Sequence, residues 1–418
     1  MSFFSLLKGH KEFTEGRAIL VDIGGGSVGA SLVNFQKEAK PEIIFSVRKQ
    51  IPIQLKSSNH RMLPLMSGVL DDVLKSVADK AFLLGKNGKD VKASYYKIFC
   101  SVSSPWNIDA TKSLNFSFQK PVMIDKKFLK ELLDRESEQF LHSLSKEAKE
   151  EYDIVGEIKH FEVVEKVVVG SFVNGYNVKN IFNKECSELE LFMFFSVMSK
   201  DVERSLSKIC LKHFVGADIE FHSAVHVYND VLGKVFPDEK DFMLIHISGE
   251  TTDITVVKNG IVTDNASFPL GRNFIARKIM EDMHGLTPNL ALSMIRVHDE
   301  KNTSPKLSEK LKNILKQVEE DWLALFSESI SDISRQFFMP SKAFILVGDG
   351  SGHLFADLIT SKKIPVFGRS PYPINAEALD ADLFIKYLNS PSIIERDPFL
   401  FAQTVFFNDF LFHYHQQN

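Results

Sequence analysis

Cysteine is scarce in this sequence, and its scarcity excludes two classes of protein. The 418 residues include only 3 cysteines, Cys100, Cys186 and Cys210. An odd number at wide spacing matches neither a disulfide framework nor a zinc site. Because a chain without disulfides suits a reducing compartment, we expect it to lie in the cytoplasm.

Long hydrophobic runs are also missing. No run approaches the ~18 apolar residues that a membrane-spanning helix requires. Residues 1–16 have the composition of a leader, but the apolar patch from Phe3 to Leu7 is interrupted too soon by Lys8 for a signal peptide. We therefore expect either a frayed terminus or an anchor that contacts a partner or the inner face of the plasma membrane.

Concentrated positive charge is absent as well. Lys and Arg number 50 against 54 for Asp and Glu, the formal net charge is −4, and no dense basic cluster occurs. This composition argues against a nucleic-acid partner. The hydrophobic share of 44% is ordinary for a globular protein, and 36 phenylalanines supply core volume. A chain of this length predicts two or more subdomains.

Two similar stretches organise the rest of the chain. Residues 19–33 and 242–262 each have the pattern of an apolar strand, a tight polar corner and a returning strand. The second continues through an Asn259-Gly260 turn into a further strand. A third glycine-rich corner, 348–352, lies between an apolar strand and a helix. Two units of one design in one chain suggest two related half-domains that face each other across a cleft.

The three corners contain residues suited to bind phosphate. Glycine lets backbone N–H groups approach an anion, hydroxyls add donors, and Asp22 or Asp253 can hold the water ligands of a divalent cation. The helix after the third corner suits a purine and ribose. One such corner is at least as often a structural hairpin, so the combination of three points to a nucleotide. The predicted nucleotide-binding residues are Asp22, Gly24, Gly25, Gly26, Ser27, Gly249, Thr251, Thr252, Gly348, Gly350 and Ser351.

A change of character near Ser94 predicts an inserted subdomain. Its expected elements are strands at 96–102, 114–118, 163–173 and 188–197 and a helix at 125–144. The predicted organisation is a leader at 1–16, a first domain at 17–93 and 199–237, an inserted α+β subdomain at 94–198, and a second domain at 238–418 with a helical part at about 285–338. Residues 399–412 are apolar on nearly all faces, which predicts a buried helix.

This arrangement resembles the actin-like ATPase superfamily and, within it, the bacterial FtsA/PilM group. The resemblance rests on the three corners, on the position of the insertion, on Pro269-Leu270-Gly271 before a helix and on the closing Asp397-Pro398-Phe399 helix. It covers the chain from about Arg17. It implies an α/β, ribonuclease H-like fold of two domains, with duplicated mixed sheets flanked by helices.

The resemblance also implies a ligand, although the second corner departs from the family pattern. It implies ATP and Mg²⁺ in the cleft, with Asp22 and Asp253 beside the metal and Gly271 and Arg296 beside the nucleotide. Where the family has Asp-x-Gly-Gly-Gly-Thr-Thr-Asp, residues 246–253 of this chain are HISGETTD. His246 replaces an acidic residue that helps to position magnesium, and a carboxylate at Glu250 would repel a triphosphate. We therefore expect weakened binding of ATP and Mg²⁺.

The function implied by the resemblance is that of a scaffold with at most weak ATPase activity. Such a protein self-associates into filaments or dimers and docks onto membrane-bound cell-division or pilus proteins. Two alternatives remain, a nucleotide-independent pseudo-ATPase scaffold and an actin-fold phosphotransferase or phosphatase. For an enzyme, the candidate general bases are Asp153, His160 and His222, and each belongs to a residue type that is common on surfaces or in cores.

Overall fold

The computed structural model describes residues 15–54, 59–86, 97–151, 160–178, 180–299, 305–334, 338–348, 351–366 and 369–412. Within these ranges, two five-stranded sheets have equivalent strand orders, β3-β2-β1-β4-β9 and β12-β11-β10-β13-β16. In each sheet, a three-stranded antiparallel meander is extended by two parallel strands. The first sheet comprises β1 (Glu15–Ile23), β2 (Ser27–Gln36), β3 (Glu42–Gln50), β4 (Lys97–Val102) and β9 (Asp218–Ser223), and the second β10 (Phe242–Ile247), β11 (Thr252–Lys258), β12 (Ile261–Phe268), β13 (Lys342–Val347) and β16 (Asn375–Ala378). The predicted duplication of mixed sheets is confirmed.

The central strands are apolar on both faces because each face lies against a different core. Along β1, Leu20 faces one hydrophobic cluster and Val21 another. Along β10, Leu244 faces the same cluster as Leu20, whereas Ile245 faces a third. One core is therefore shared between the two sheets, and it joins them into a single body. The predicted turn between β11 and β12 is also present, with positive φ at both Asn259 and Gly260.

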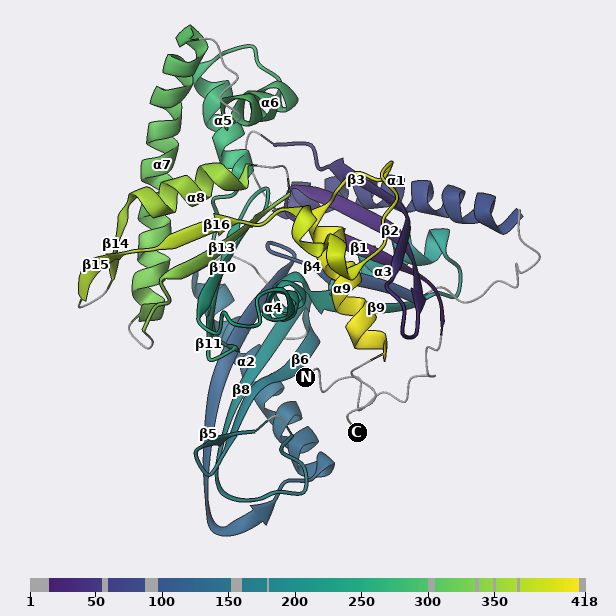
Figure 1. The fold of residues 1–418 in the computed structure, drawn as a ribbon, viewed down its shortest axis with the longest axis vertical. Coiled ribbons are helices and arrows are strands. Elements are labelled where there is room, and N and C mark those ends of the chain that lie inside the picture. The colour runs from purple at the N-terminus through teal and green to yellow at the C-terminus, as the bar shows by residue number, and fades with distance from the viewer. Residues whose placement is uncertain are drawn as a thin grey trace.

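Two helices fill the shared core. They are α4 (Ala224–Val235), which follows β9, and α9 (Pro398–Phe412), which lies beside α4 at the centre of Figure 1. A 3₁₀ helix, η2 (Ala381–Tyr387), packs on α9. Nearly every residue of α9 is buried, as its uniformly apolar sequence predicts.

Helices also cover the outer faces of both sheets. The first sheet is covered by α1 (Asn59–Lys86) and α3 (Lys200–His213), and the second by α5 (Arg272–Asp282), α6 (Pro288–Asp299), α7 (Pro305–Ser334) and α8 (Gly352–Ser361). A hairpin of β14 (Lys363–Val366) and β15 (Arg369–Pro373) follows α8. Among the described helices, none is long and apolar enough to span a membrane. Residues 1–14 of the predicted leader lie outside the described residues.

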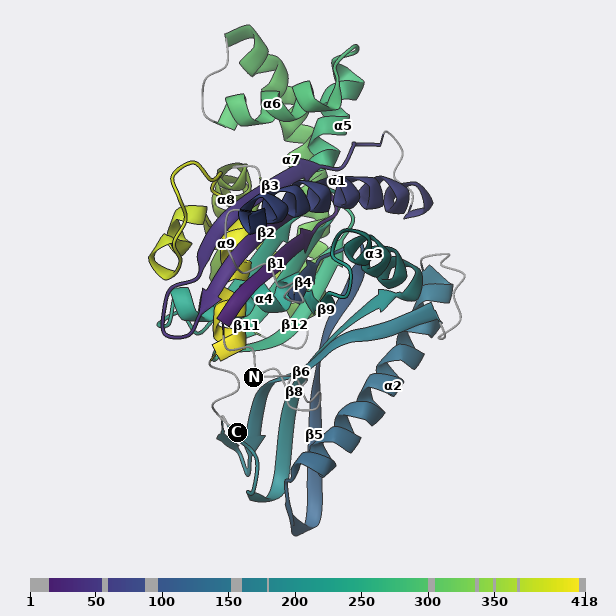
Figure 2. The same ribbon diagram turned by 90° about the vertical axis from the view of Figure 1, so that its right-hand side faces the viewer.

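The inserted subdomain is a separate antiparallel sheet with one helix against it. Its strands are β5 (Asn107–Met123), β6 (Phe161–Val173), β7 (Tyr176–Asn177) and β8 (Glu185–Ser199), in the order β5-β8-β6-β7, and α2 (Lys126–Glu151) packs on one face. Figure 2 shows this sheet extending from the end of the molecule opposite α6. The strand β4, which the sequence predicts as part of the subdomain, belongs to the first sheet instead, where it pairs in parallel with β1 and β9. Such pairing between distant segments leaves no local pattern in the sequence.

The inserted sheet contacts both halves of the molecule. Thr111 Oγ1 donates to Asn265 Oδ1 on β12 at 2.6 Å. Gly170 of β6 packs against Ile261 at the start of β12, where a Cβ atom on the glycine would lie 2.5 Å from Ile261 Cγ2. On its other side, Glu165 of β6 contacts the end of β9. The subdomain is thus fixed to the first and the second sheet together.

Candidate functional site

The first two corners are tight turns at equivalent places in the two sheets. In the first, between β1 and β2, the N–H of Gly24 donates to the carbonyl oxygen of Ser27 at 3.1 Å. In the second, between β10 and β11, the N–H of Ser248 donates to the carbonyl oxygen of Thr251 at 2.9 Å. Both corners therefore form at the positions that the sequence predicts.

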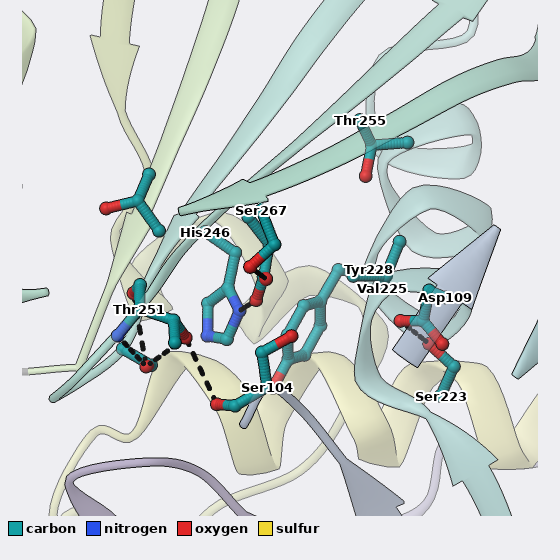
Figure 3. Close-up of polar contacts among 12 residues, drawn as sticks. Ser104, Asp109, Ser223, Val225, Tyr228, His246, Thr251, Thr255 and Ser267 are labelled. Carbon is teal, nitrogen blue, oxygen red and sulfur yellow. Dashed lines mark hydrogen bonds and ion pairs between the residues drawn. The ribbon is translucent and has the colours of Figure 1, made fainter. Parts of the chain in front are cut away.

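The two corners touch each other across the cleft. A Cβ atom on Gly26 would lie 2.6 Å from Cα of Gly249, and one on Gly249 would lie 2.3 Å from Cα of Gly26. Thr251 Oγ1 donates to the carbonyl oxygen of Ser104, in the loop after β4, at 3.2 Å (Figure 3). The cavity that remains between the corners has about 20 Å³, which is room for roughly one water molecule. The two predicted phosphate-binding corners lie next to each other, as the sequence predicts. They are in direct contact, however, so the space between them is too small for a phosphate.

The carboxylate of Asp22 faces this closed contact and is bound by protein groups. The Tyr228 hydroxyl donates to its Oδ1 at 2.9 Å, and the Gln403 amide donates to the same oxygen at 3.3 Å. Burial raises the pKa of Asp22, although the positive charge of Arg48 lowers it. Asp22 is therefore a buried structural acceptor in this arrangement.

Arg48 of β3 is the central cation of the cleft, and it is not among the site residues that the sequence predicts. Its Nη1 donates to Ser27 Oγ at 2.9 Å, and its Nη2 lies 2.9 Å from Asp22 Oδ2. Its Nε donates to Asp397 Oδ2, at the start of α9, at 2.6 Å. The guanidinium also lies 5.0 Å from the ring centroid of Phe399. Only 10% of the Arg48 side chain is exposed, so its charge is matched inside the protein.

Glu250 does not point toward a phosphate position, contrary to our expectation. Its Oε2 lies 2.8 Å from Arg277 Nη2, and its Oε1 accepts from Arg277 Nη1 at 3.1 Å and from Asn273 Nδ2 at 2.8 Å. Both partners belong to α5. The carboxylate thus joins the second corner to this helix, and its negative charge is neutralised there.

The other unusual residue of the second corner, His246, pairs with Asp253. Its Nδ1 lies 3.3 Å from Asp253 Oδ2, and Ser267 donates to Asp253 Oδ1 at 2.7 Å (Figure 3). The His246 ring packs against those of Tyr228 and Phe399, which also contact each other. In the described part of the chain, no three His, Cys, Asp or Glu side chains are grouped to hold an ion. The predicted metal ligands Asp22 and Asp253 therefore each have internal partners and do not form a metal cluster.

Thr252 faces away from the cleft. Its Oγ1 donates to the carbonyl oxygen of Leu270 at 2.7 Å and accepts from Trp322 Nε1 at 3.2 Å. Strand alternation explains the difference from Thr251, because successive side chains point to opposite faces. Thr252 thus belongs to the core of the second domain.

Gly271 closes the space behind the second corner. A Cβ atom on it would lie 2.5 Å from the carbonyl oxygen of Ser248. The N–H groups of Arg272 and Asn273, the first of α5, donate to the carbonyl oxygens of Ser248 and Gly249 at 3.0 and 2.8 Å. A helix offers these N–H groups to a phosphate when they are free. Here both N–H groups already donate to carbonyl oxygens of the second corner.

The third corner borders a larger cleft. Gly348 follows β13, and a Cβ atom on it would lie 2.4 Å from the ring of Phe399. Ser351, before α8, is buried. Gly350 and the side chain of Arg296 lie outside what the structure describes. The cleft has about 490 Å³, a size typical of small-molecule sites. Its lining includes Arg48, Gln50, Gly348, His353, Asp380 and Arg396.

Comparison with known proteins identifies the fold. No family model and no curated protein sequence matches the chain. Among solved structures, it is similar to PilM of a "PilM-PilN type IV pilus biogenesis complex", with a TM-score of 0.58 and 12% identity over 93% of this chain and 97% of that chain. The chain has the actin-like fold. A sequence identity of 12% supports a common fold only. Evidence on activity therefore comes from the residues of the site.

Two further structures are more distant from this actin-like chain. One is the ethanolamine utilization protein EutJ from Carboxydothermus hydrogenoformans, with a TM-score of 0.42 and 9% identity over 95% of this chain and 92% of that one. The other is a protein of unknown function with an actin-like ATPase fold from Bacteroides thetaiotaomicron, with a TM-score of 0.39 and 9% identity over 96% and 99%.

The described residues of this actin-like cleft do not fit a magnesium-bound nucleoside triphosphate. The corners that would receive the phosphates are in contact, with about 20 Å³ between them. The carboxylates that would hold the metal waters, Asp22 and Asp253, accept hydrogen bonds from protein groups. The volume beside the third corner is large enough for a small ligand, but its lining includes no residue of the first two corners.

The residues that close the cleft gave little signal in the sequence. Arg48 lies in an ordinary strand, and its partner Asp397 is 349 residues away. Asp397 itself could have been recognised as a helix cap, because an Asp before a proline commonly starts a helix. Arg277 follows Glu250 by 27 residues, on a helix whose angle to the corner no local pattern reports.

Proposed function

We propose that the chain is an actin-like scaffold protein of a type IV pilus-like assembly. The supporting observation is the similarity to PilM, which covers 93% of this chain. The unmatched remainder is smaller than the inserted sheet, residues 107–199, so the similarity includes at least part of that sheet. PilM is in complex with PilN in that structure. By analogy, this chain docks a partner protein that is attached to the membrane, and it self-associates into dimers or filaments.

The site geometry favours a scaffold over a phosphotransferase or phosphatase. A general base has to reach a substrate, yet His222 is 6% exposed and packs against Glu165 and the rings of Phe407 and Phe410. Asp22 is equally enclosed. Asp153 lies outside the described residues. Asp22 and the buried His222 therefore serve the fold.

Proximity labelling in the native cell tests the scaffold role. The full chain would be fused to a biotin ligase, and its labelled neighbours compared with those of the free ligase. We expect enrichment of pilus assembly proteins. Enrichment of cell-division proteins would assign the scaffold to division instead, and enrichment of neither group would contradict the proposal.

A turnover assay tests the enzyme alternative directly. Phosphate release from ATP and from polyphosphate would be measured with the purified full chain and with heat-inactivated protein. We expect equal rates. Release by the folded chain well above the inactivated control would show an enzyme and count against a purely structural role.

A further inference from the structure

We propose that internal ion pairs centred on Arg48 take the place of a bound magnesium nucleotide in this chain, hold the cleft closed, and leave it unable to bind magnesium ATP. The inference goes beyond the scaffold role, because it concerns how the two halves are held together. It rests on the space, the charges and the donors of the cleft.

The space between the corners is the first argument. Phosphates bind between such loops only if the loops stand apart by more than the width of the anion. Here the backbones of Gly26 and Gly249 are so close that neither position has room for a methyl group. Gly25 is similarly confined, with a Cβ position 2.9 Å from Pro105 Cδ and 3.0 Å from Ser248 Oγ. A triphosphate therefore enters only if the two halves separate.

The charges of the cleft are the second argument. Arg48 bridges Asp22 of β1 and Asp397, the residue before α9, at distances of 2.9 and 2.6 Å. One guanidinium thus joins the first sheet to the helix that follows the last strand of the second sheet. A buried arginine with two carboxylates already matches more negative charge than its own, so a polyanion gains little there. Asp22 and Arg48 lie on the same sheet, so separation of the halves can break only the pair between Arg48 and Asp397.

The donors are the third argument. The N–H groups at the start of α5 bind the second corner itself, and Arg277 is paired with Glu250. Arg272 contacts Gln50 of β3 across the cleft. These N–H groups and arginines are therefore already bound to protein acceptors. The contact of Arg272 with Gln50 on β3 adds a second connection between the halves.

Thermal unfolding of the purified full chain tests the inference. Nucleotide-free protein would be scanned alone and with millimolar magnesium ATP or magnesium ADP. Because a ligand that binds only the folded state raises the midpoint, we expect no shift with either nucleotide. A saturable rise of several degrees that requires magnesium would overturn the proposal.

Variants of Arg48 test whether the ion pairs hold the cleft closed. Spin labels on cysteines introduced at Lys75 of α1 and Leu290 of α6, both exposed, would report the distance between the halves. We expect Arg48→Met to broaden the distance distribution and Arg48→Lys to restore part of the closed population. The matched control, Arg204→Met on the exposed face of α3, should leave it unchanged. An unchanged distribution in Arg48→Met would also overturn the proposal.

Hydrogen exchange of the unmutated protein covers the case in which Arg48→Met does not fold. The amides of 24–27 and 248–252 should have the same protection with and without magnesium ATP. Slower exchange of both corners on addition of the nucleotide would contradict the inference. The scaffold role is judged separately, because nucleotide binding would leave the labelled partners unaffected, and absent partners would leave the nucleotide result intact.

Discussion

At the scale of single residues, a buried carboxylate and two histidines join the inserted sheet to the first domain. Glu165 Oε1 lies 3.0 Å from His222 Nδ1 and 2.9 Å from His226 Nδ1, and its Oε2 accepts from the N–H of Ser223 at 2.9 Å. Burial alone would raise the pKa of Glu165, but the charges of both histidines lower it well below its usual range. Burial opposes protonation of His222, yet its hydrogen bond to Glu165 and the negative charge of Glu220, 3.7 Å from its Nε2, raise its pKa to about 9. His222 is therefore charged at neutral pH.

This charge predicts a contribution to stability that depends on pH. The pKa of His222 is raised from 6.5 to about 9, so the contribution is complete below about pH 6.5 and is lost as the pH rises through about 9. We expect His222→Gln to lower the free energy of unfolding by up to about 3 kcal/mol at about pH 6, and by clearly less at about pH 10. Urea denaturation of both proteins at the two pH values measures the difference.

The exposed His160, just before β6, provides the control for this experiment. His160→Gln should cost little, because this side chain is exposed. A cost of His222→Gln that stays constant with pH would show that the histidine contributes by packing alone.

At the scale of elements, the corners and the burial of α9 could be predicted from the sequence. The ion pairs that Arg48 and Glu250 form could not. Glycine-rich turns after apolar strands are local patterns, and the uniform apolarity of α9 reports its burial directly. Arg48 and Asp397 meet only because α9 returns to the first sheet at the end of the chain. The expectation that the Glu250 carboxylate faces a triphosphate was wrong for a similar reason, since α5 supplies its partners.

The start of α9 carries a further prediction. Asp397 Oδ1 accepts from the N–H groups of Phe399 and Leu400 at 3.0 and 3.1 Å, so this residue caps the helix and also pairs with Arg48. Removal of a cap costs ~1 kcal/mol, whereas removal of one partner from a buried ion pair costs ~3–5 kcal/mol. We expect Asp397→Ala to lower the free energy of unfolding by about 3 kcal/mol or more, measured by urea denaturation.

Ser199, the N-cap residue before α3, separates the two effects of Asp397, because it is a cap without a buried charge. Its side chain accepts from the N–H of Asp201 at 3.3 Å. Ser199→Ala should cost only ~1 kcal/mol. If Asp397→Ala cost no more than this, the pair with Arg48 would contribute little to stability.

At the scale of the whole molecule, the inserted sheet reinforces the closed arrangement of the two halves. It is bound to the first domain through Glu165 and to the second through β12, where Thr111 meets Asn265. Relative movement of the halves therefore has to displace the inserted sheet from one of them. This coupling predicts that the contact between β6 and β12 stabilises the entire chain.

Gly170 and Ile261 make that contact testable by a double-mutant cycle. Because a Cβ atom on Gly170 would lie 2.5 Å from Ile261 Cγ2, Gly170→Ala should cost ~1–3 kcal/mol by overpacking, and Ile261→Ala should cost ~2–5 kcal/mol by leaving a cavity. The double variant should cost less than the sum by ~1–2 kcal/mol, since the alanine methyl fills part of that cavity. Gly68→Ala, at a helical position with open space around the glycine, should be neutral or slightly stabilising. Strict additivity in urea denaturation would mean that the inserted sheet and the second domain are not held together at this point.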